Sequence, residues 1–269
     1  MHLELRIRLG PIMAGALNKP RIKRCSLAVA TGWTSLCSER RVMRFFRLHF
    51  LLPIMCLGAV VQAQTSAPFA QLDRPDTPAG YLARLLVNEV PFPGERAYES
   101  EANSQEAMLQ ILWVLHGRIH HIPKGYTQQQ VAGVRSEDII DVITGEGGRR
   151  QCEGFYRNSA GQFITAPRVE ERIKYLLKIA NSGSKPGRFA VLLNHAQGLA
   201  RAYIKEGMAG ADRYANLRRI GSVDVTGRAY SWMTDMDSYH PGGNFVTIPS
   251  PENGSLGGNR FFTLRKNPK

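Results

Sequence analysis

The stretch QEAMLQILWVLHGRI, residues 105–119, is apolar nearly all the way round when it is wound as a helix. A helix on a protein surface has one apolar stripe, whereas a helix that is apolar on every side is buried in the centre of a domain. Ser104 stands directly before this stretch and is a favourable N-cap residue. The sequence therefore predicts a buried central helix at residues 104–119, around which the other elements are arranged.

Four further helices are predicted from caps, proline positions and apolar periodicity. They are Pro78–Val90 after the cap Thr77, a short helix after Ser136, one that opens at Thr165 and Pro167, and one at residues 188–206. Beyond Ser222, Gly and Pro are frequent, and the β-type runs NFVTI and RFFTL are short. We therefore expect a mainly α (α+β) single domain with a short β-containing C-terminal part.

Residues 43–63 have the three-part plan of a secretory signal peptide. A basic start is followed by an apolar stretch from Leu48 to Val61, and then by Val-Gln-Ala before Gln64. An uncleaved membrane anchor is the alternative, but the apolar stretch contains Pro53 and is short for a bilayer span. We expect cleavage after Ala63 and an exported protein, periplasmic or extracellular, with no stable membrane anchor.

This leader divides the chain into an upstream extension (1–42), the signal peptide (43–63), a linker (64–75) and a folded domain (76–269). The net charge is +13, but residues 1–63 contain ten Lys or Arg and two Glu, so the domain itself is only mildly basic. It contains no nucleic-acid-binding motif, and nucleic acid is not an expected partner. Cys152 is the one cysteine after residue 63, so the domain must be held together by its core rather than by a disulfide.

In the first predicted helix, Glu89 lies in the middle of an apolar face. Tyr81, Leu82, Leu85 and Leu86 fall within an arc of about 140°, and Glu89 is near the centre of that arc. Apolar surroundings raise the pKa of a carboxyl group, which keeps a proton available at neutral pH. Glu89 is therefore a candidate general acid, unless the helix ends early and leaves it in water.

Several short stretches occur in an order that resembles the SleB-type cell-wall hydrolases, which include the spore-cortex-lytic enzymes. They are LLVNEVPFPGE, EAMLQILWVLHGRI, EDIIDVITG, RRQCEGF, GRAYSWM and SLGGNRFFTL. The resemblance implies a small, lysozyme-like or lytic-transglycosylase-like domain that cleaves the glycan strands of peptidoglycan. It also implies that Glu89 is the catalytic Glu of that family.

The chain departs from the family pattern at several positions. The usual Gln-Phe pair corresponds to Gln151 and Phe155, which are separated here, and the Asn-Arg pair after the buried helix is Gly117-Arg118. The usual His of the last strand motif is Asn259, and Phe262 replaces Tyr. These departures bear on substrate contacts more than on the catalytic acid.

Cleavage of a glycosidic bond requires a proton for the bridging oxygen. A hydrolase also needs a second carboxylate, whereas a lytic transglycosylase can use one acid because a muramyl hydroxyl of the substrate attacks the anomeric carbon. Glu95 lies close in sequence, and we expect it to fix the loop after the helix and to border the substrate. We expect single-acid transglycosylation by Glu89, and hydrolysis stays open.

Three further residues are candidate contacts to the sugars. Gln151 could bind an amide or a hydroxyl, although a loop Gln in water fits equally well. Tyr230 and Trp232 are two residues apart, so an extended segment places both rings on one side, where sugars stack well. Core packing would explain one of these rings as easily.

Two alternatives belong to other functional classes. Cys152 with His195 or His240 would provide the nucleophile and the base that a cysteine peptidase acting on peptidoglycan stems requires at least. Cys152, however, follows a loop and lacks the helix N-terminus that would activate a thiolate. The other alternative is a non-catalytic envelope-binding protein on the same scaffold.

Neither a cofactor nor a metal is expected. His116 and His120 share a helix face, but no carboxylate completes a His-Glu-x-x-His arrangement. Asp235 and Asp237 suggest calcium, but the other ligands of a calcium loop are not correctly spaced. The expected partner is peptidoglycan.

Overall fold

The computed structural model describes residues 69–145, 152–183, 187–234, 240–250 and 254–266. The helices are α1 (Pro78–Asn88), α2 (Glu101–His120), α3 (Gln128–Ala132), α4 (Ile139–Thr144), α5 (Pro167–Ala180) and α6 (Arg188–Glu206). The strands are β1 (Phe155–Arg157), β2 (Phe163–Thr165), β3 (Arg219–Ile220), β4 (Val223–Thr234), β5 (Phe245–Thr247), β6 (Ser255–Leu256) and β7 (Asn259–Arg265). The predicted upstream extension and signal peptide lie outside the described residues.

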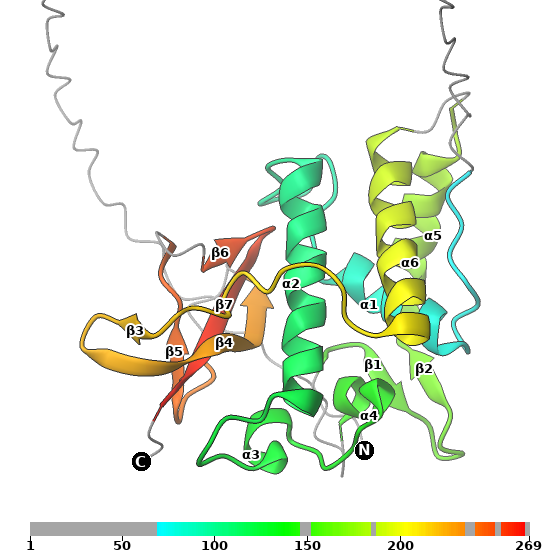
Figure 1. Ribbon diagram of the computed structural model, residues 1–269. Coiled ribbons are helices and arrows are strands. Elements are labelled where there is room, and N and C mark those ends of the chain that lie inside the picture. Colours follow the sequence, from blue (N-terminus) through cyan, green and yellow to red (C-terminus); the bar gives the residue numbers. More distant parts are fainter. Residues whose placement is uncertain (1–68, 146–151, 184–186, 235–239, 251–253, 267–269) are drawn as a thin grey trace, which may run out of the picture. The chain divides into compact units, whose positions relative to one another are not determined.

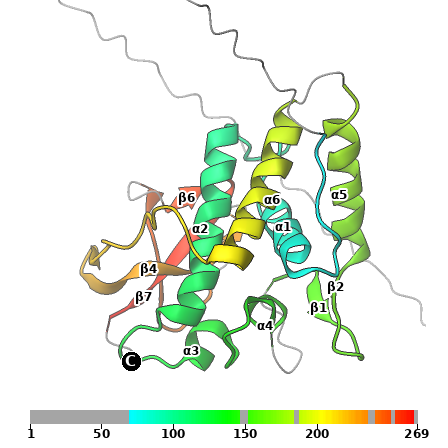
Figure 2. The same ribbon diagram turned by 45° about the vertical axis from the view of Figure 1, so that its right-hand side comes forward.

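Helix α2 lies between the larger sheet on one side and helices α1, α5 and α6 on the other (Figure 1), and the rotated view in Figure 2 agrees. Its N-cap is Ser100, whose Oγ accepts a hydrogen bond from the backbone N of Asn103 at 3.1 Å. Ser104, the predicted cap, lies inside the helix and donates its hydroxyl to the carbonyl of Pro91 at 2.9 Å. The prediction of a buried central helix is confirmed, although the helix begins earlier than expected.

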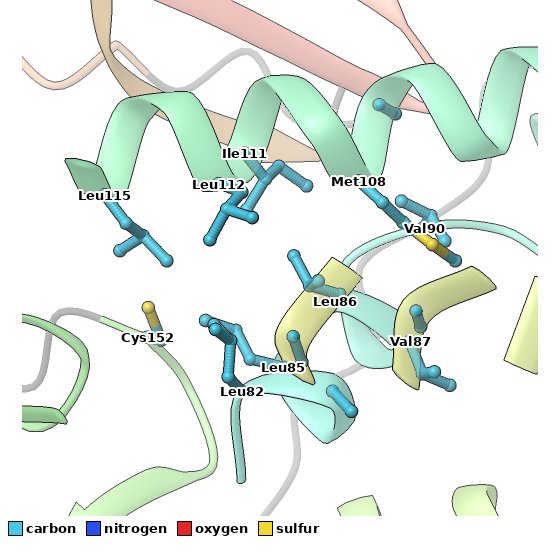
Figure 3. Close-up of a cluster of buried hydrophobic side chains, with 14 of the residues drawn as sticks. Leu82, Leu85, Leu86, Val87, Val90, Met108, Ile111, Leu112, Leu115 and Cys152 are labelled. Atoms are coloured by element: carbon cyan, nitrogen blue, oxygen red, sulfur yellow. The ribbon is translucent and has the colours of Figure 1, made fainter. Parts of the chain in front are cut away.

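The core between α1 and α2 consists of aliphatic side chains. Figure 3 shows Leu82, Leu85 and Leu86 of α1 opposite Met108, Ile111, Leu112 and Leu115 of α2. All seven are at most 2% exposed. Because full burial of one such side chain contributes about 1.5–3 kcal/mol, this contact fixes α1 firmly against the central helix.

Helix α1 begins where the sequence predicts and ends earlier. The Oγ1 of Thr77 accepts a hydrogen bond from the backbone N of Gly80 at 3.1 Å, and Pro78 is the first helical residue. The helix ends at Asn88, because the residue before a proline disfavours the helical conformation and Pro91 follows closely. Glu89 is therefore the C-cap residue and not an interior position of the helix.

Helices α5 and α6 pack against α1 and against the segment that precedes it (Figure 1). Asn181, at the end of α5, accepts a hydrogen bond from Ala70 N at 2.9 Å and donates one to Ala70 O at 3.0 Å. Asp73 forms an ion pair with Arg201 of α6. From residue 70 onward, the segment that we expected to be a linker is thus attached to the helices.

The larger sheet is antiparallel, with strand order β3-β4-β7-β5, and β6 also pairs with β7. The pairing of β4 with β7 shifts between Ala229, opposite Thr263, and Ser231, opposite Phe262. Tyr230 is thus an extra residue in β4, and such a β-bulge changes the direction in which side chains point. Gly257, in the turn before β7, has a φ of +53°, and a Cβ there would lie 2.4 Å from the Cβ of Ala107 in α2.

The expectation of a mainly α, lysozyme-like or lytic-transglycosylase-like domain is wrong. Among the residues that the structure describes, helix accounts for 42% and strand for 18%, with a curled five-strand antiparallel sheet, so this is a mixed α+β protein and no lysozyme-like fold is identified. The longest element that we did not predict is the twelve-residue strand β4, and helix α3 and the hairpin of β1 and β2 were not predicted either. The buried positions Val225, Gly227 and Ala229 of β4 are small, so the period-two alternation of apolar residues is weak in the sequence.

Candidate functional site

Glu89 connects the end of α1 to the sheet. Its backbone N–H donates to the carbonyl of Leu85 at 3.0 Å, which completes the last turn of the helix. Its own carbonyl accepts a hydrogen bond of 2.6 Å from Nδ2 of Asn259 in β7. Although the helix ends early, the Glu89 side chain is half-buried and not free in water.

The carboxylate of Glu89 accepts two side-chain hydrogen bonds. Nε1 of Trp232 donates to Oε2 at 2.9 Å, and Nδ2 of Asn88 is 3.3 Å from Oε1. Burial raises the pKa of Glu89 above its ordinary value, and the negative charge of Glu153 adds to this rise. The two hydrogen bonds and the charge of Arg172 oppose it, because they favour the ionised form. The net shift is upward, as a general acid requires.

Two adjoining hollows meet at Glu89. One of about 250 Å³ is also bordered by Arg96 and Gly258, and the other of about 540 Å³ by Cys152, Glu153 and Trp232. Both are bordered by Asn88, Glu89, Arg172 and Thr234. The carboxyl group therefore lies where a ligand that extends across both hollows would pass.

Arg172 of α5 holds the end of α1 and the loop that follows. Its Nη1 donates to the carbonyl of Val87 at 2.7 Å and its Nη2 to the carbonyl of Val90 at 3.1 Å. A cation at this position also complements the negative end of the helix dipole.

Glu95, a predicted substrate contact, is paired with protein groups. Its Oε2 accepts hydrogen bonds from Nη2 of Arg172 at 2.6 Å and from the backbone N of Phe92 at 2.7 Å, and its Oε1 accepts one from Nε of Arg172 at 3.2 Å. Glu95 borders the smaller hollow as well. These contacts fix the loop after α1, as we expected of this residue.

Arg118 is a buried cation next to Trp232 for which we predicted no role. Its Nε donates to the carbonyl of Tyr230 at 2.8 Å, and its guanidinium carbon is 5.4 Å from the centre of the Trp232 ring. Its Nη1 is buried and has no hydrogen-bond partner among the described residues. Arg118 thus packs against the ring that donates to Glu89. The signal in the sequence was an arginine within an otherwise apolar helix.

The structure brings one of the two predicted stacking rings to Glu89. Trp232 borders the larger of the two hollows, whereas Tyr230 borders neither of them and is only 2% exposed. The hydroxyl of Tyr230 donates to the carbonyl of His121 at 2.7 Å. The third predicted contact, Gln151, lies outside the described residues.

Cys152 lies in the apolar core, with its sulfur between Leu115 of α2 and Leu82 and Leu85 of α1 (Figure 3). Burial raises the pKa of its thiol, the charge of Glu89 adds to this rise, and the charge of Arg118 opposes it. A thiol that keeps its proton is a poor nucleophile, since the thiolate is the reactive form.

The two candidate histidine partners of Cys152 have other surroundings. His240 is exposed, and its Nδ1 accepts a hydrogen bond from the backbone N of Gly242 at 2.9 Å. His195 is in α6, and its Nε2 has no hydrogen-bond partner within the described part of the chain. Burial is the main influence on the pKa of His195, which is lowered. These surroundings give no support to a cysteine peptidase.

Among the described residues, no group of three or more His, Cys, Asp or Glu side chains could hold a metal ion. The ring of His116 lies 4.5 Å from that of His120 and 5.3 Å from that of His121. Burial and the neighbouring positive charges lower the pKa of His116 to about 4, so its imidazole is neutral at pH 7. Asp235 and Asp237 fall outside the residues that the structure describes.

Neither a family model, nor a curated protein, nor a solved structure matches the chain significantly. In the described ranges, no helix is both long enough and apolar enough to cross a membrane.

Proposed function

We propose that this protein is an exported enzyme that cleaves the glycan strands of peptidoglycan, with Glu89 as the general acid. The observation that carries the proposal is the position of Glu89, whose carboxyl group has a raised pKa and lies where two hollows meet. A general acid in glycosidic cleavage must still carry its proton at neutral pH, and a raised pKa keeps that proton on the carboxyl group. The resemblance of the sequence to the SleB-type hydrolases implies the same residue.

In the proposed reaction, protonated Glu89 gives its proton to the bridging oxygen as the glycosidic C–O bond breaks. A hydroxyl of the same muramyl sugar then attacks the anomeric carbon, forms an internal anhydro ring and returns its proton to the Glu89 carboxylate. Water is not consumed, and Glu89 ends in its starting state. Between the two proton transfers, the N–H groups of Trp232 and Asn88 stabilise the carboxylate.

The neighbouring residues have distinct roles in this proposal. Trp232 borders the larger hollow and offers an aromatic surface for a sugar ring. Arg172 and Glu95 keep the end of α1 and the following loop in position. Arg96 borders the smaller hollow, is exposed and would face the carboxylates of a peptide stem.

Hydrolysis is the second candidate, because one carboxylate other than Glu95 borders a hollow at Glu89. Glu153 borders the larger hollow together with Glu89 and forms an ion pair of 2.5 Å with Arg168. In a hydrolase, such a second carboxylate activates water or attacks the sugar directly. The side chain of Glu153 is 81% exposed, so its carboxylate is in contact with water.

Analysis of the products on purified cell walls tests the proposal. The secreted protein is incubated with peptidoglycan, and the released muropeptides are identified by mass spectrometry. Anhydro ends are expected from transglycosylation, whereas reducing ends would indicate hydrolysis. Glu89→Gln should release nothing, and Glu171→Gln, an exposed acid on α5, should behave as the parent. If no product is released by the parent, the protein is not a glycan-cleaving enzyme.

A further inference from the structure

A separate hollow of about 960 Å³ is formed by the end of α2, the loop after it, strand β4 and the end of the chain after β7. None of the residues that border it also borders the two hollows at Glu89. Its cationic and titratable nitrogen-bearing side chains are His120, His121, Lys124, Arg218, Arg228 and Lys266. Asp224 is the one carboxylate among the residues that border it.

Most of the lysine and arginine charges at this hollow are not neutralised by a carboxylate of the described residues. Lys124 and Lys266 are exposed and form no salt bridge within the described residues. Nη1 of Arg218 donates to the carbonyls of Ala215 at 2.8 Å and Leu217 at 3.2 Å, which orients the guanidinium without cancelling its charge.

Two acids reduce the positive charge around this hollow without removing it. Arg228 forms an ion pair with Asp212, whose side chain is 5% exposed. Oδ1 of Asp224 lies 3.9 Å from Nε of Arg219. Both of these side chains are about two-thirds exposed, so solvent weakens the ion pair. The hollow therefore keeps a net positive charge, contributed by residues that are far apart in the sequence.

We propose that this hollow binds phosphate groups of an anionic ligand. One guanidinium group can bind a single carboxylate with two parallel hydrogen bonds. Several cations from different elements instead suit a phosphate group, which carries up to two negative charges and several acceptor oxygens. The cations here come from the loop after α2, the segment before β3, strand β4 and the end of the chain. The phosphate could belong to a free small molecule or to a lipid headgroup, and the two sources are separable by experiment.

Binding of inorganic pyrophosphate, measured by calorimetry at fixed ionic strength, tests the site. We expect saturable binding at one site, weakened at least about tenfold in Lys124→Gln/Lys266→Gln because two charge-assisted contacts are lost. The matched control is Lys174→Gln/Lys178→Gln, which removes two exposed lysines from α5 and should bind within about twofold of the parent. An equal loss in the control, or no saturable binding, would overturn the proposal.

Two further arms locate the site and identify the source of the phosphate. Glu89→Gln should bind pyrophosphate as the parent does, so this proposal and the proposed function can fail separately. If Glu89→Gln abolishes binding, the phosphate site is at Glu89 and the assignment is wrong. Co-sedimentation with phosphatidylglycerol vesicles, and with phosphatidylcholine vesicles as control, tests a lipid source. Anionic-vesicle binding that is lost in Lys124→Gln/Lys266→Gln indicates a headgroup, and pyrophosphate binding alone indicates a free ligand.

Discussion

Trp232 donates its indole N–H to Oε2 of Glu89 at 2.9 Å, across 143 positions of sequence. This hydrogen bond joins strand β4 to the end of helix α1, and Arg118 of the central helix α2 packs against the same indole ring. Three elements thus determine the surroundings of one carboxyl group. The burial raises the pKa of Glu89, and the indole N–H limits the rise.

Glu89→Gln is expected to leave the protein no less stable at neutral pH. Because burial raises the pKa of Glu89 in the folded state, its stabilising contribution is present below the unfolded-state pKa of about 4.3 and is lost as the pH rises through the higher folded-state pKa. The amide does not ionise, so the variant should gain thermal stability relative to the parent as the pH rises through this window. Thermal midpoints at several pH values measure this difference. A clearly lowered midpoint at neutral pH would show that Glu89 is a structural acid.

Trp232→Phe is expected to raise the pKa of Glu89 further, because the ring is kept and the N–H donor is lost. The hydrogen bond from Trp232 favours the ionised form of Glu89, so its loss removes one of the influences that lower this pKa. The limb of the pH–rate profile that reports the ionisation of Glu89 should therefore move to higher pH. Trp113→Phe is the matched control, since Nε1 of Trp113 has no hydrogen-bond partner in the part of the chain that the structure describes. An unchanged profile in Trp232→Phe would mean that this hydrogen bond does not tune the acid.

Glu153→Gln distinguishes the two candidate mechanisms. In transglycosylation Glu153 has no chemical role, so we expect the rate to stay within about threefold of the parent and the products to keep anhydro ends. The fold should also be unaffected, because the ion pair with Arg168 is exposed and such pairs contribute about 0–1 kcal/mol. A loss of about a hundredfold or more in the rate, with intact folding, would identify Glu153 as the second carboxylate of a hydrolase.

Cys152→Ala is expected to leave glycan cleavage within about twofold of the parent, because the buried thiol has a raised pKa and takes no part in the proposed reaction. The thermal midpoint should fall modestly, since removal of the sulfur leaves a small gap among Leu82, Leu85 and Leu115. Muropeptide release and the midpoint are measured on the same preparation. Complete loss of activity with an unchanged midpoint would support the cysteine peptidase instead.

The helical part of the fold could be predicted because its signals are local. Thr77 and Pro78 begin α1 as expected, Pro167 begins α5, and the all-round apolar stretch at 105–119 forms the buried helix α2. Caps and the 3.6-residue period depend on neighbours within one or two turns, so one sequence contains them. The same local pattern identified Glu89 as an acid among apolar residues.

The sheet and the residues that contact Glu89 could not be predicted from local sequence, because both depend on tertiary structure. Strand β4 pairs with β7, which lies about thirty residues further along the sequence. The small buried residues of β4 and its extra residue Tyr230 leave no clear alternation of apolar and polar residues. Arg172, Trp232 and Asn259 contact Glu89 or the end of its helix across 85 to 170 positions of sequence, from α5, β4 and β7 respectively. The sequence alone determined that an acid would lie at the end of an apolar helix. Only the packing of distant elements determined how deeply this acid is buried and which groups donate hydrogen bonds to it, because these depend on which atoms exclude water.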